Sequence, residues 1–369
     1  MDNILYISGD GLFDSTQNII YHKHFSIHST KNYFISRELK TIVSNSEVIN
    51  FSWWFGHPRF IVKLESSGLR GTTRIKTIIT KFINLISRII IYWKIKINSV
   101  DLIVFSDNLF FLDILLIRRI KKLTSSKIIL LSGVSPKYLL PQSHKECIPY
   151  FDNIFISDPG HEAEWKQYGA TNINVLPLSA SCPNTFQRIV KKNINREKYD
   201  IVFIGRLDLG GNEHRIKILN FLLSKGVEIK IWTMYMSKKY LNKYLNKYPL
   251  VKNNIMGSAY GEEMVKILGQ SKIALNIHDP SQPCGGNLRL FEIPSTKTFQ
   301  IVDKCPSDWF IDGHEIVLFT DKYELLSKVN YYLNNDQERI RISNNGYKRL
   351  LKEHTYQHRV KEILRTIHY

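Results

Sequence analysis

The sequence predicts an α/β protein built from two domains of the doubly wound type. The chain has 369 residues, the length of about two ordinary domains. Short runs rich in Ile, Val and Phe alternate with longer segments of helical periodicity. This alternation occurs twice, and a polar stretch at residues 179–198 separates the two series. Strand and helix in regular alternation indicate parallel sheets covered by helices.

The first series predicts six strands, several of them apolar throughout, which is typical of parallel strands buried on both faces. The strands are expected at residues 3–8, 48–53, 101–106, 127–132, 153–157 and 173–178. The helical patterns between them cover residues 72–96, 109–124 and 160–168. We therefore expect an N-terminal domain over residues 1–190.

The second series predicts a further domain of the same type over residues 199–350. The stretch at 179–198 contains charge, Asn and Pro with little periodicity, and it is interpreted as an interdomain linker. Strands are then expected at residues 200–204, 227–232, 272–277, 299–302 and 315–319. Helices are expected at residues 213–225, 237–247, 261–270, 322–334 and 336–352, with a helical tail within residues 351–369.

The composition narrows the class of protein and of partner. Hydrophobic residues make up 43% and charged residues 23%, which excludes a wholly disordered or low-complexity chain. The formal net charge of +18 favours anionic partners, namely nucleic acid, acidic lipid headgroups or phosphorylated substrates. A lysine-rich solvated surface is the plain alternative.

Cysteine usage and the absence of targeting signals favour the cytoplasm. The four cysteines form no C-x-x-C pair, and no Cys/His cluster has zinc spacing. The N-terminus has neither the basic nor the apolar region of a signal peptide. No uncharged apolar stretch reaches the ~18 residues that a transmembrane helix requires.

Two segments at predicted strand ends are candidate ligand sites. Gly9, Asp10 and Gly11 follow the first strand, where glycines permit a tight turn and a close approach of ligand to backbone. The pattern is not G-x-G-x-x-G, so an ordinary turn is an equal alternative. Gly205 and Arg206 end the first strand of the second domain, and Arg215 follows on the next helix. A guanidinium at a strand end can bind a diphosphate, and the alternative is an arginine that is simply solvated.

The strongest candidate follows the predicted strand at 272–277. Asn276 and His278 end this strand, and a loop leads to Gly285-Gly286-Asn287 and a short helix expected to begin near Gly286. Free backbone N–H groups at a helix start attract phosphate, and Gly-Gly lets it come close. Glu292 could accept the hydroxyls of a ribose. The alternative is a capped helix in which Arg289 and Glu292 pair at i,i+3.

A fourth feature is a window without acidic residues between Glu65 and Asp101. Seven Lys and Arg fall in it, and the helical wheel places apolar side chains on one face and basic or polar ones on another. A basic amphipathic helix indicates a membrane-surface element. A domain helix with its apolar face on the sheet is an equal alternative.

Five pieces of the sequence, in order, resemble a known enzyme family. They are residues 152–170 (with DNIFI and YGA), 176–180 (LPLSA), 199–215 (YDIVFIG with Arg215), 287–294 (NLRLFEIP) and 353–359 (EHTYQHR). In these pieces the chain resembles the CgeB-type, group-1 glycosyltransferases of the GT-B fold. The resemblance covers residues 150 to 360, and it implies two Rossmann-like domains that face a cleft holding a nucleotide-sugar donor. It also implies that the C-terminal helix, within residues 351–369, crosses back to the N-terminal domain.

The resemblance also implies roles for the residues singled out above. Glu292 would hold the ribose, while Gly285, Gly286, Arg289 and Arg206 would lie near the diphosphate. Nucleobase contacts would come from Trp232, Thr233 and Tyr260. The full set of expected donor-binding residues is Gly9, Gly11, Gly205, Arg206, Arg215, Trp232, Thr233, Tyr260, Asn276, His278, Gly285, Gly286, Asn287, Arg289 and Glu292.

The expected chemistry needs no metal and no cofactor. The sequence has no Asp-x-Asp, and fixed arginines can stabilise a leaving diphosphate. An inverting enzyme also needs a general base. The first candidates are Asp10 and Asp107, which both follow strands, and the second candidates are His57 and His161. Related retaining enzymes have Glu-x7-Glu, but here Cys284 stands eight residues before Glu292, so the stereochemistry stays open.

The sequence thus predicts a glycosyltransferase that moves a sugar from a nucleotide-sugar to a hydroxyl of a glycan or lipid-linked acceptor. Surface polysaccharide or glycolipid synthesis is the expected context, in the cytoplasm or peripherally on the inner face of the membrane. One alternative is a DNA-modifying glucosyltransferase of the phage kind, since +18 also suits a phosphate backbone. The others are a non-catalytic nucleic-acid-binding protein with a degenerate transferase fold, and another GT-B enzyme such as a sugar-nucleotide epimerase.

Overall fold

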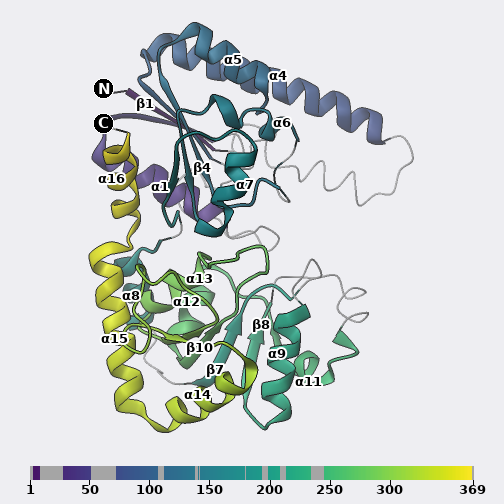
Figure 1. The fold of residues 1–369 in the computed structure, drawn as a ribbon, viewed down its shortest axis with the longest axis vertical. Coiled ribbons are helices and arrows are strands. Elements are labelled where there is room, and N and C mark those ends of the chain that lie inside the picture. The colour runs from purple at the N-terminus through teal and green to yellow at the C-terminus, as the bar shows by residue number, and fades with distance from the viewer. Residues whose placement is uncertain are drawn as a thin grey trace. The chain divides into compact units, whose positions relative to one another are not determined.

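The computed structural model shows two compact units, each an α/β sheet with its own core (Figure 1). The residues it describes are 3–8, 28–50, 72–106, 112–137, 140, 142–178, 180–192, 198–207, 213–233 and 245–367. The first unit contains the described residues up to 178 together with 359–367, and the second contains the described residues of 179–358. The second unit therefore begins where the sequence predicted the linker to begin.

The first unit contains a six-stranded sheet in the order β2-β1-β3-β4-β5-β6, and all neighbouring strands are parallel. Its strands are β1 (Asn3–Ser8), β2 (Asn45–Asn50), β3 (Leu102–Ser106), β4 (Lys127–Ser132), β5 (Asn153–Ile156) and β6 (Ile173–Val175). β2 begins three residues before its predicted start, and the other five overlap their predicted ranges.

Helices cover this sheet. They are α1 (His28–Ile42), α4 (Thr72–Asn98), α5 (Ile114–Leu123), α6 (Gln142–Lys145), η1 (Ile148–Tyr150), η2 (Pro159–His161), α7 (Glu162–Gln167) and α16 (Tyr356–Thr366), whose residues from Arg359 belong to this unit. Ile91 of α4, Ile117 of α5 and Trp165 of α7 are fully buried against alternate strand residues such as Leu5. α1 was not predicted. No helix within the described ranges is long and apolar enough to cross a membrane.

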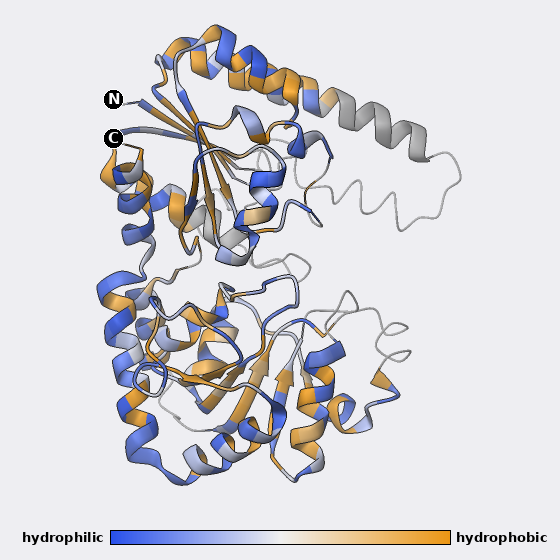
Figure 2. Ribbon diagram, in the orientation of Figure 1, coloured by the Kyte–Doolittle hydropathy of each residue, from blue (hydrophilic) through white to orange (hydrophobic). Residues whose placement is uncertain are grey.

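The second unit contains another six-stranded parallel sheet, in the order β12-β11-β10-β7-β8-β9. Its strands are β7 (Tyr199–Ile204), β8 (Ile229–Trp232), β9 (Ile255–Gly257), β10 (Ser271–Asn276), β11 (Phe299–Val302) and β12 (Val317–Leu318). The short β9 was not predicted. Two parallel sheets with helices confirm the predicted α/β class, and Figure 2 shows their strands as largely hydrophobic.

Helices cover both faces of the second sheet. They are α8 (Pro183–Lys192), α9 (Glu213–Ser224), α11 (Pro249–Asn253), α12 (Gly261–Gly269), α13 (Arg289–Ser295), α14 (Lys322–Asn334) and α15 (Asp336–Glu353). α9 and α14 pack on one face, against Ile201, Ile229 and Ile273. α8, α12 and α13 pack on the other, against Val202 and Ala274. Of the predicted helix at 237–247, residues 237–244 lie outside the described ranges.

The interpretation of residues 179–198 as a linker was wrong, because most of their described part is helical. Phe186 and Val190 of α8 are buried in the core beside α12. Their i,i+4 spacing, with the partly buried Ile189 between them, gives one narrow apolar face to an otherwise polar segment. Pro183 begins the helix at a position where its missing N–H costs no hydrogen bond. The polar composition therefore concealed a helix that completes the second core.

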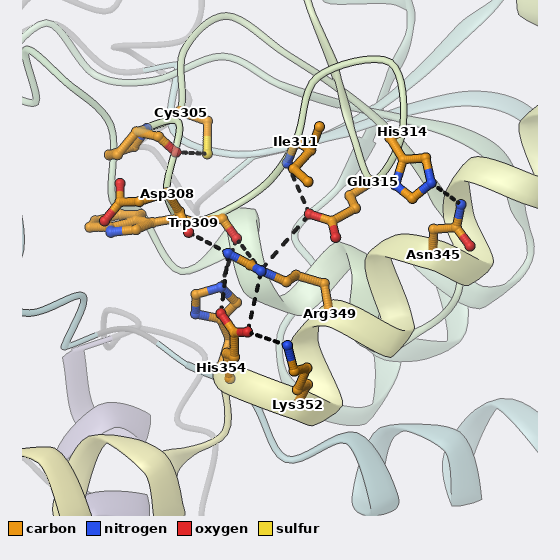
Figure 3. Close-up of polar contacts among 12 residues, drawn as sticks. Cys305, Asp308, Trp309, Ile311, His314, Glu315, Asn345, Arg349, Lys352 and His354 are labelled. Carbon is orange, nitrogen blue, oxygen red and sulfur yellow. Dashed lines mark hydrogen bonds and ion pairs between the residues drawn. The ribbon is translucent and has the colours of Figure 1, made fainter.

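The end of α15 fixes α13, the short helix that carries the strongest candidate residues. The imidazole of His354, directly after α15, is buried, packs 5.3 Å from the ring of Phe291 in α13 and hydrogen-bonds to the carbonyl of Trp309 at 2.7 Å. Arg349 of α15 donates to the carbonyls of Asp308 and Trp309 and pairs with Glu353 (Figure 3). The segment 353–359 thus contributes a structural contact beneath α13.

A prediction follows from Gly346, which lets α15 lie against the loop that holds Glu315. A Cβ at this position would lie 2.4 Å from the carbonyl oxygen of Glu315. Replacing an exposed helical glycine with alanine normally stabilises a protein. Here we expect Gly346→Ala to lower the free energy of unfolding by about 1–3 kcal/mol, because α15 must shift. Thermal and urea denaturation followed by circular dichroism measure this change.

Lys348→Ala on the same helix is the matched control, since Lys348 is exposed. It is expected to change stability by no more than about 0.5 kcal/mol. A Gly346→Ala protein that is as stable as the wild type, or more stable, would show that the loop yields without cost.

Candidate functional site

In the second sheet, β7 and β10 are neighbours at the point where the strand order reverses. From β7 the chain continues through β8 and β9, and it then returns to β10 on the other side of β7. Ligands of open parallel sheets bind beyond the carboxyl ends of strands at such a point. Gly205 and Arg206 follow β7, and residues 277–278 follow β10. Two of the candidate segments therefore lie at one edge of the sheet.

Arg215 of α9 binds the backbone of both segments. Its Nε donates to the carbonyl of Ile277 at 2.7 Å, and its Nη1 donates to the carbonyl of Arg206 at 3.0 Å. The neighbouring His214 places its Nε2 2.9 Å from the carbonyl of His278. Arg215 is buried, so these bonds are shielded from water. The structure therefore assigns Arg215 to the support of the two strand ends, with its guanidinium occupied by carbonyls.

A pair of asparagine amides joins the end of β10 to the start of α13. Asn287 donates to Oδ1 of Asn276 at 2.7 Å, and Asn276 donates to Oδ1 of Asn287 at 3.2 Å. The same Oδ1 of Asn287 accepts the N–H of Leu290 at 2.9 Å. Asn287 therefore satisfies a backbone donor in the first turn of α13, which begins at Arg289. Both residues hold the loop that they flank.

Arg289 connects α13 to β7. Its Nε donates to the carbonyl of Ile204, the last residue of β7, at 3.1 Å. Its Nη1 forms an ion pair with Oε2 of Glu292, so the structure contains the i,i+3 pair that the sequence offered as an alternative. The side chains of Arg289 and Glu292 are only 11% and 10% exposed. A charged pair thus lies at the edge beside the end of β7.

His278 and Asp303 form a second polar pair, between the ends of β10 and β11. Nδ1 of His278 lies 2.6 Å from Oδ1 of Asp303, and the backbone N–H of His278 donates to both carboxylate oxygens at 3.1 and 3.0 Å. Because a carboxylate only accepts, Nδ1 carries a proton. His278 is fully buried, and its Nε2 has no hydrogen-bond partner among the residues that the structure describes.

Gly285 leaves space beside this nitrogen. A Cβ at Gly285 would lie 3.5 Å from Nε2 of His278 and 3.2 Å from the carbonyl oxygen of Lys304. Gly285 and Gly286 have φ of 107° and 120°, which only glycine adopts without strain. Both glycines therefore serve the turn, and Gly285 places no side chain beside Nε2. An unsatisfied buried donor or acceptor is costly, and such atoms cluster at functional sites.

Two cysteines, Cys284 and Cys305, lie in this region. Cys284 and Cys305 are free thiols, as are Cys147 and Cys182. Burial raises the pKa of the Cys305 thiol to about 12, so it is protonated at neutral pH. Asp279, a nearby acid, accepts the N–H of Ser281 at 2.9 Å within a turn.

The other residues that were predicted to bind the nucleotide-sugar differ in their exposure to solvent. Arg206 is exposed after β7, and Thr233 is buried, with its Oγ1 accepting the N–H of Leu207 at 3.2 Å. Trp232 is 5% exposed and packs edge-on to Tyr199 in the core, with ring centroids 5.2 Å apart. Tyr260 lies half-buried at the start of α12. Their roles toward a nucleobase stay predictions.

The candidates in the first unit lie mostly outside the described residues. The strand order also reverses between β1 and β3, which pair in parallel. Gly9, Asp10 and Gly11 follow β1 and Asp107 follows β3, and all four lie outside the described residues, as does His57. His161 is buried at the end of η2.

Two contributors to the site were not predicted from the sequence. Asp303 directly follows β11, so the rule that places ligands at carboxyl ends of strands could have pointed to it. His214 sits in a helix, and nothing in the sequence links it to the carbonyl of His278. Within the described part of the chain, no three His, Cys, Asp or Glu side chains gather so that they could hold a metal ion. The need for a metal stays untested.

Arg215 generates a prediction about stability. Arg215→Leu leaves the buried carbonyl of Ile277 without its donor, and a hydrogen bond to a charged group contributes about 1.5–3 kcal/mol. We expect the free energy of unfolding to fall by about this amount, as measured by urea denaturation. Lys217→Leu is the control, because the Lys217 side chain is 63% exposed on the same helix. Equal stability of the two variants would mean that water replaces the guanidinium.

The chain is similar to known proteins in part of its sequence and in its fold. Residues 215–365 match the model of a family described as glycosyl transferase-like. No curated protein matches the chain by sequence. Sucrose-phosphate synthase from Thermosynechococcus elongatus shares the fold with a TM-score of 0.66 at 10% identity, over 99% of each chain.

Two further solved structures share the fold at similar identity. A glycosyltransferase from Rickettsia africae ESF-5 has a TM-score of 0.61 at 12% identity, over 99% of this chain and 97% of that one. HepE from Anabaena in complex with UDP-glucose has a TM-score of 0.60 at 11% identity, over 99% of each chain. These likenesses confirm the predicted GT-B fold class. The chain is thus similar to a glycosyl transferase-like family over residues 215–365, and it shares its fold with these solved structures.

Proposed function

We propose that the protein transfers a sugar from a nucleotide-sugar donor to a hydroxyl group of a glycan or lipid-linked acceptor, as a CgeB-type glycosyltransferase. The observation that carries the proposal is the edge where β7 and β10 end. There Arg289, paired with Glu292, binds the last carbonyl of β7, and the buried Nε2 of His278 lies near Gly285, where no Cβ intervenes. HepE, which shares the fold, has been solved with UDP, with UDP and glucose, and with UDP-glucose.

The donor would bind this edge through three groups. Glu292 would accept the ribose hydroxyls through Oε1, while its Oε2 keeps the ion pair with Arg289. The diphosphate would lie beside Gly285 and Gly286, because a ligand can approach a backbone closely where no Cβ intervenes. His278 would contact the diphosphate through Nε2, held in orientation by Asp303. The exposed Arg206 would reach the same phosphates.

Transfer requires that negative charge developing on the leaving diphosphate be stabilised. Arg206 and Arg289 would supply this positive charge, which is the basis for proposing a metal-independent hexosyltransferase. His278 would donate to the diphosphate in the form that carries a proton on Nε2 as well as on Nδ1. Fixed donors of this kind do not have to reorganise during the reaction. Asp10 and Asp107 are the proposed general bases for an inverting reaction, since they follow β1 and β3 at the other reversal of strand order.

Surface polysaccharide or glycolipid synthesis on the cytoplasmic side of a membrane is the proposed context. The four free cysteines are in keeping with a reducing compartment, and +18 favours an anionic acceptor or surface. The same charge also suits the DNA acceptor of a phage-type glucosyltransferase. Retention of the purified protein on DNA in preference to anionic vesicles would favour that second function.

A thermal-shift series tests the donor site. Nucleoside diphosphates and nucleotide sugars, with UDP and UDP-glucose first, are added to the wild type and to Glu292→Gln. A ligand that binds only the native state stabilises it by about 2.7 kcal/mol at a hundredfold excess over its Kd. We expect one nucleoside diphosphate to raise the melting temperature of the wild type and not that of Glu292→Gln, which has lost its anionic acceptor.

Glu338→Gln is the matched control, because Glu338 also pairs at i,i+3 with an arginine, Arg341, on α15. It should respond to nucleotides like the wild type. If no nucleotide shifts the wild type, the donor site is wrong, and binding of DNA and anionic lipid becomes the next measurement.

A second prediction separates the phosphate end of the site from the ribose end. His278→Ala should weaken the binding of a nucleoside diphosphate by about tenfold to a hundredfold, the equivalent of one charge-assisted hydrogen bond. It should leave the binding of the matching nucleoside monophosphate nearly unchanged, whereas Glu292→Gln should weaken both. Isothermal titration measures the affinities, and His314→Ala, at an exposed histidine of the same unit, is the control. Equal losses for both nucleotides would place His278 away from the terminal phosphate.

A further inference from the structure

Five large apolar side chains form an exposed stripe along α4. Phe82, Leu85, Ile89, Trp93 and Ile97 are 62%, 55%, 55%, 58% and 57% exposed. Their spacing of three or four residues places them on one face of the helix. At 1.5 Å per residue the stripe is about 22 Å long. We call these five residues the α4 stripe.

The α4 stripe is additional to the face that α4 uses for folding. Ile91 and Ile95 are buried in the core of the first unit, and Ser87 lies on the same inner side. The helix is therefore apolar on two opposite faces, and only one of them packs on the sheet. Scattered exposed apolar residues are ordinary, but a continuous row of large ones indicates an interaction surface.

The surroundings of the stripe are cationic. α4 carries six Lys and Arg and the neighbouring α5 carries four, and neither helix contains Asp or Glu. The guanidinium of Arg119 in α5 lies 5.0 Å from the ring centre of Tyr92, and the ammonium of Lys94 lies 5.3 Å from that of Trp93. Figure 1 shows α4 and α5 together on the same side of the first sheet. Three of these cations, Arg88, Lys94 and Lys121, pair with Asp113, Glu47 and Asp152 of neighbouring segments. The positive charge that borders the stripe where α5 meets α4 therefore comes from the other Lys and Arg, such as Arg119.

We propose that the α4 stripe is a docking surface for an anionic lipid bilayer, with α4 lying in the plane of the interface. Aromatic and aliphatic side chains would enter the boundary between headgroups and acyl chains, while the cations of α4 and α5 contact lipid phosphates. No described helix can cross a membrane, so α4 would lie on the surface. This surface belongs to the first unit and stands independently of the proposed donor site.

The charges argue against two other occupants. A second copy of the chain, docked stripe to stripe, would bring the cations of α4 and α5 against their equivalents, and like charges across an interface disfavour binding. A nucleic acid would use the cations but leave Phe82, Ile89 and Trp93 in water, since phosphate contacts come from charged and polar groups. A lipid bilayer is the partner that uses both kinds of side chain.

Vesicle co-sedimentation of the full chain tests the proposal. The vesicles contain phosphatidylcholine alone or with about 30 mol% phosphatidylglycerol, a strongly anionic surface. The wild type is expected to bind the anionic vesicles and not the neutral ones. The triple variant Phe82→Gln/Ile89→Gln/Trp93→Gln keeps every charge and changes only exposed side chains. It should lose at least about tenfold in binding, because the buried apolar area drives insertion.

The matched control is Met256→Gln/Tyr323→Gln/Ile340→Gln, at apolar residues of the second unit that are 54%, 65% and 51% exposed. It should bind like the wild type, and unchanged circular dichroism should confirm that both variants fold. Equal binding of the stripe variant and the wild type would overturn the proposal, since charge alone would then explain association. A stripe-dependent dimer in sedimentation velocity, or stripe-dependent DNA binding without vesicle binding, would also overturn it. None of these readouts depends on nucleotide binding.

Discussion

The candidate site depends on one topological constraint, the adjacency of β7 and β10. These strands are far apart in the chain, yet they pair in parallel because the strand order reverses between them. The carboxyl ends of parallel strands share one edge, so the segments after β7, β10 and β11 must leave the sheet together. The side-chain contacts of Arg215, Arg289, His278 and Asp303 join β7, the segments that follow β7, β10 and β11, and the helices α9 and α13.

Two arginines, the buried Arg215 and the partly buried Arg289, hold the segments at this shared edge in a fixed geometry. Arg215 binds the carbonyls after β7 and β10, and Arg289 binds the last carbonyl of β7. Loop backbones carry unsatisfied carbonyls that must find donors, and a guanidinium offers five in a rigid fork. Arg289, which the proposed function places near a diphosphate, is thus held in place by the last carbonyl of β7.

The helix α4 also serves two purposes, since one face packs in the core and the other is the proposed docking surface. A single helix presents Ile91 and Ile95 to the sheet and the α4 stripe to the outside. The sequence offered these two faces as competing interpretations, a membrane-surface helix or a domain helix. The structure shows a domain helix with a second apolar face that does not pack on the sheet. Its apolar residues cover more of the circumference than one sheet can bury. The two interpretations are compatible because they concern opposite sides of the helix.

The sequence by itself determined the parallel α/β class, the turns that follow β7 and β10, and the glycines beside His278. These are local signals, because an apolar run or a Gly-Gly turn has the same physical meaning in any context. Only the tertiary structure decided that residues 183–192 form a core helix, that Arg215 binds two carbonyls, and that Asp303 holds His278. Each of these contacts joins residues from different strands or helices. Their partners are set by strand order, which a pattern along the chain does not encode.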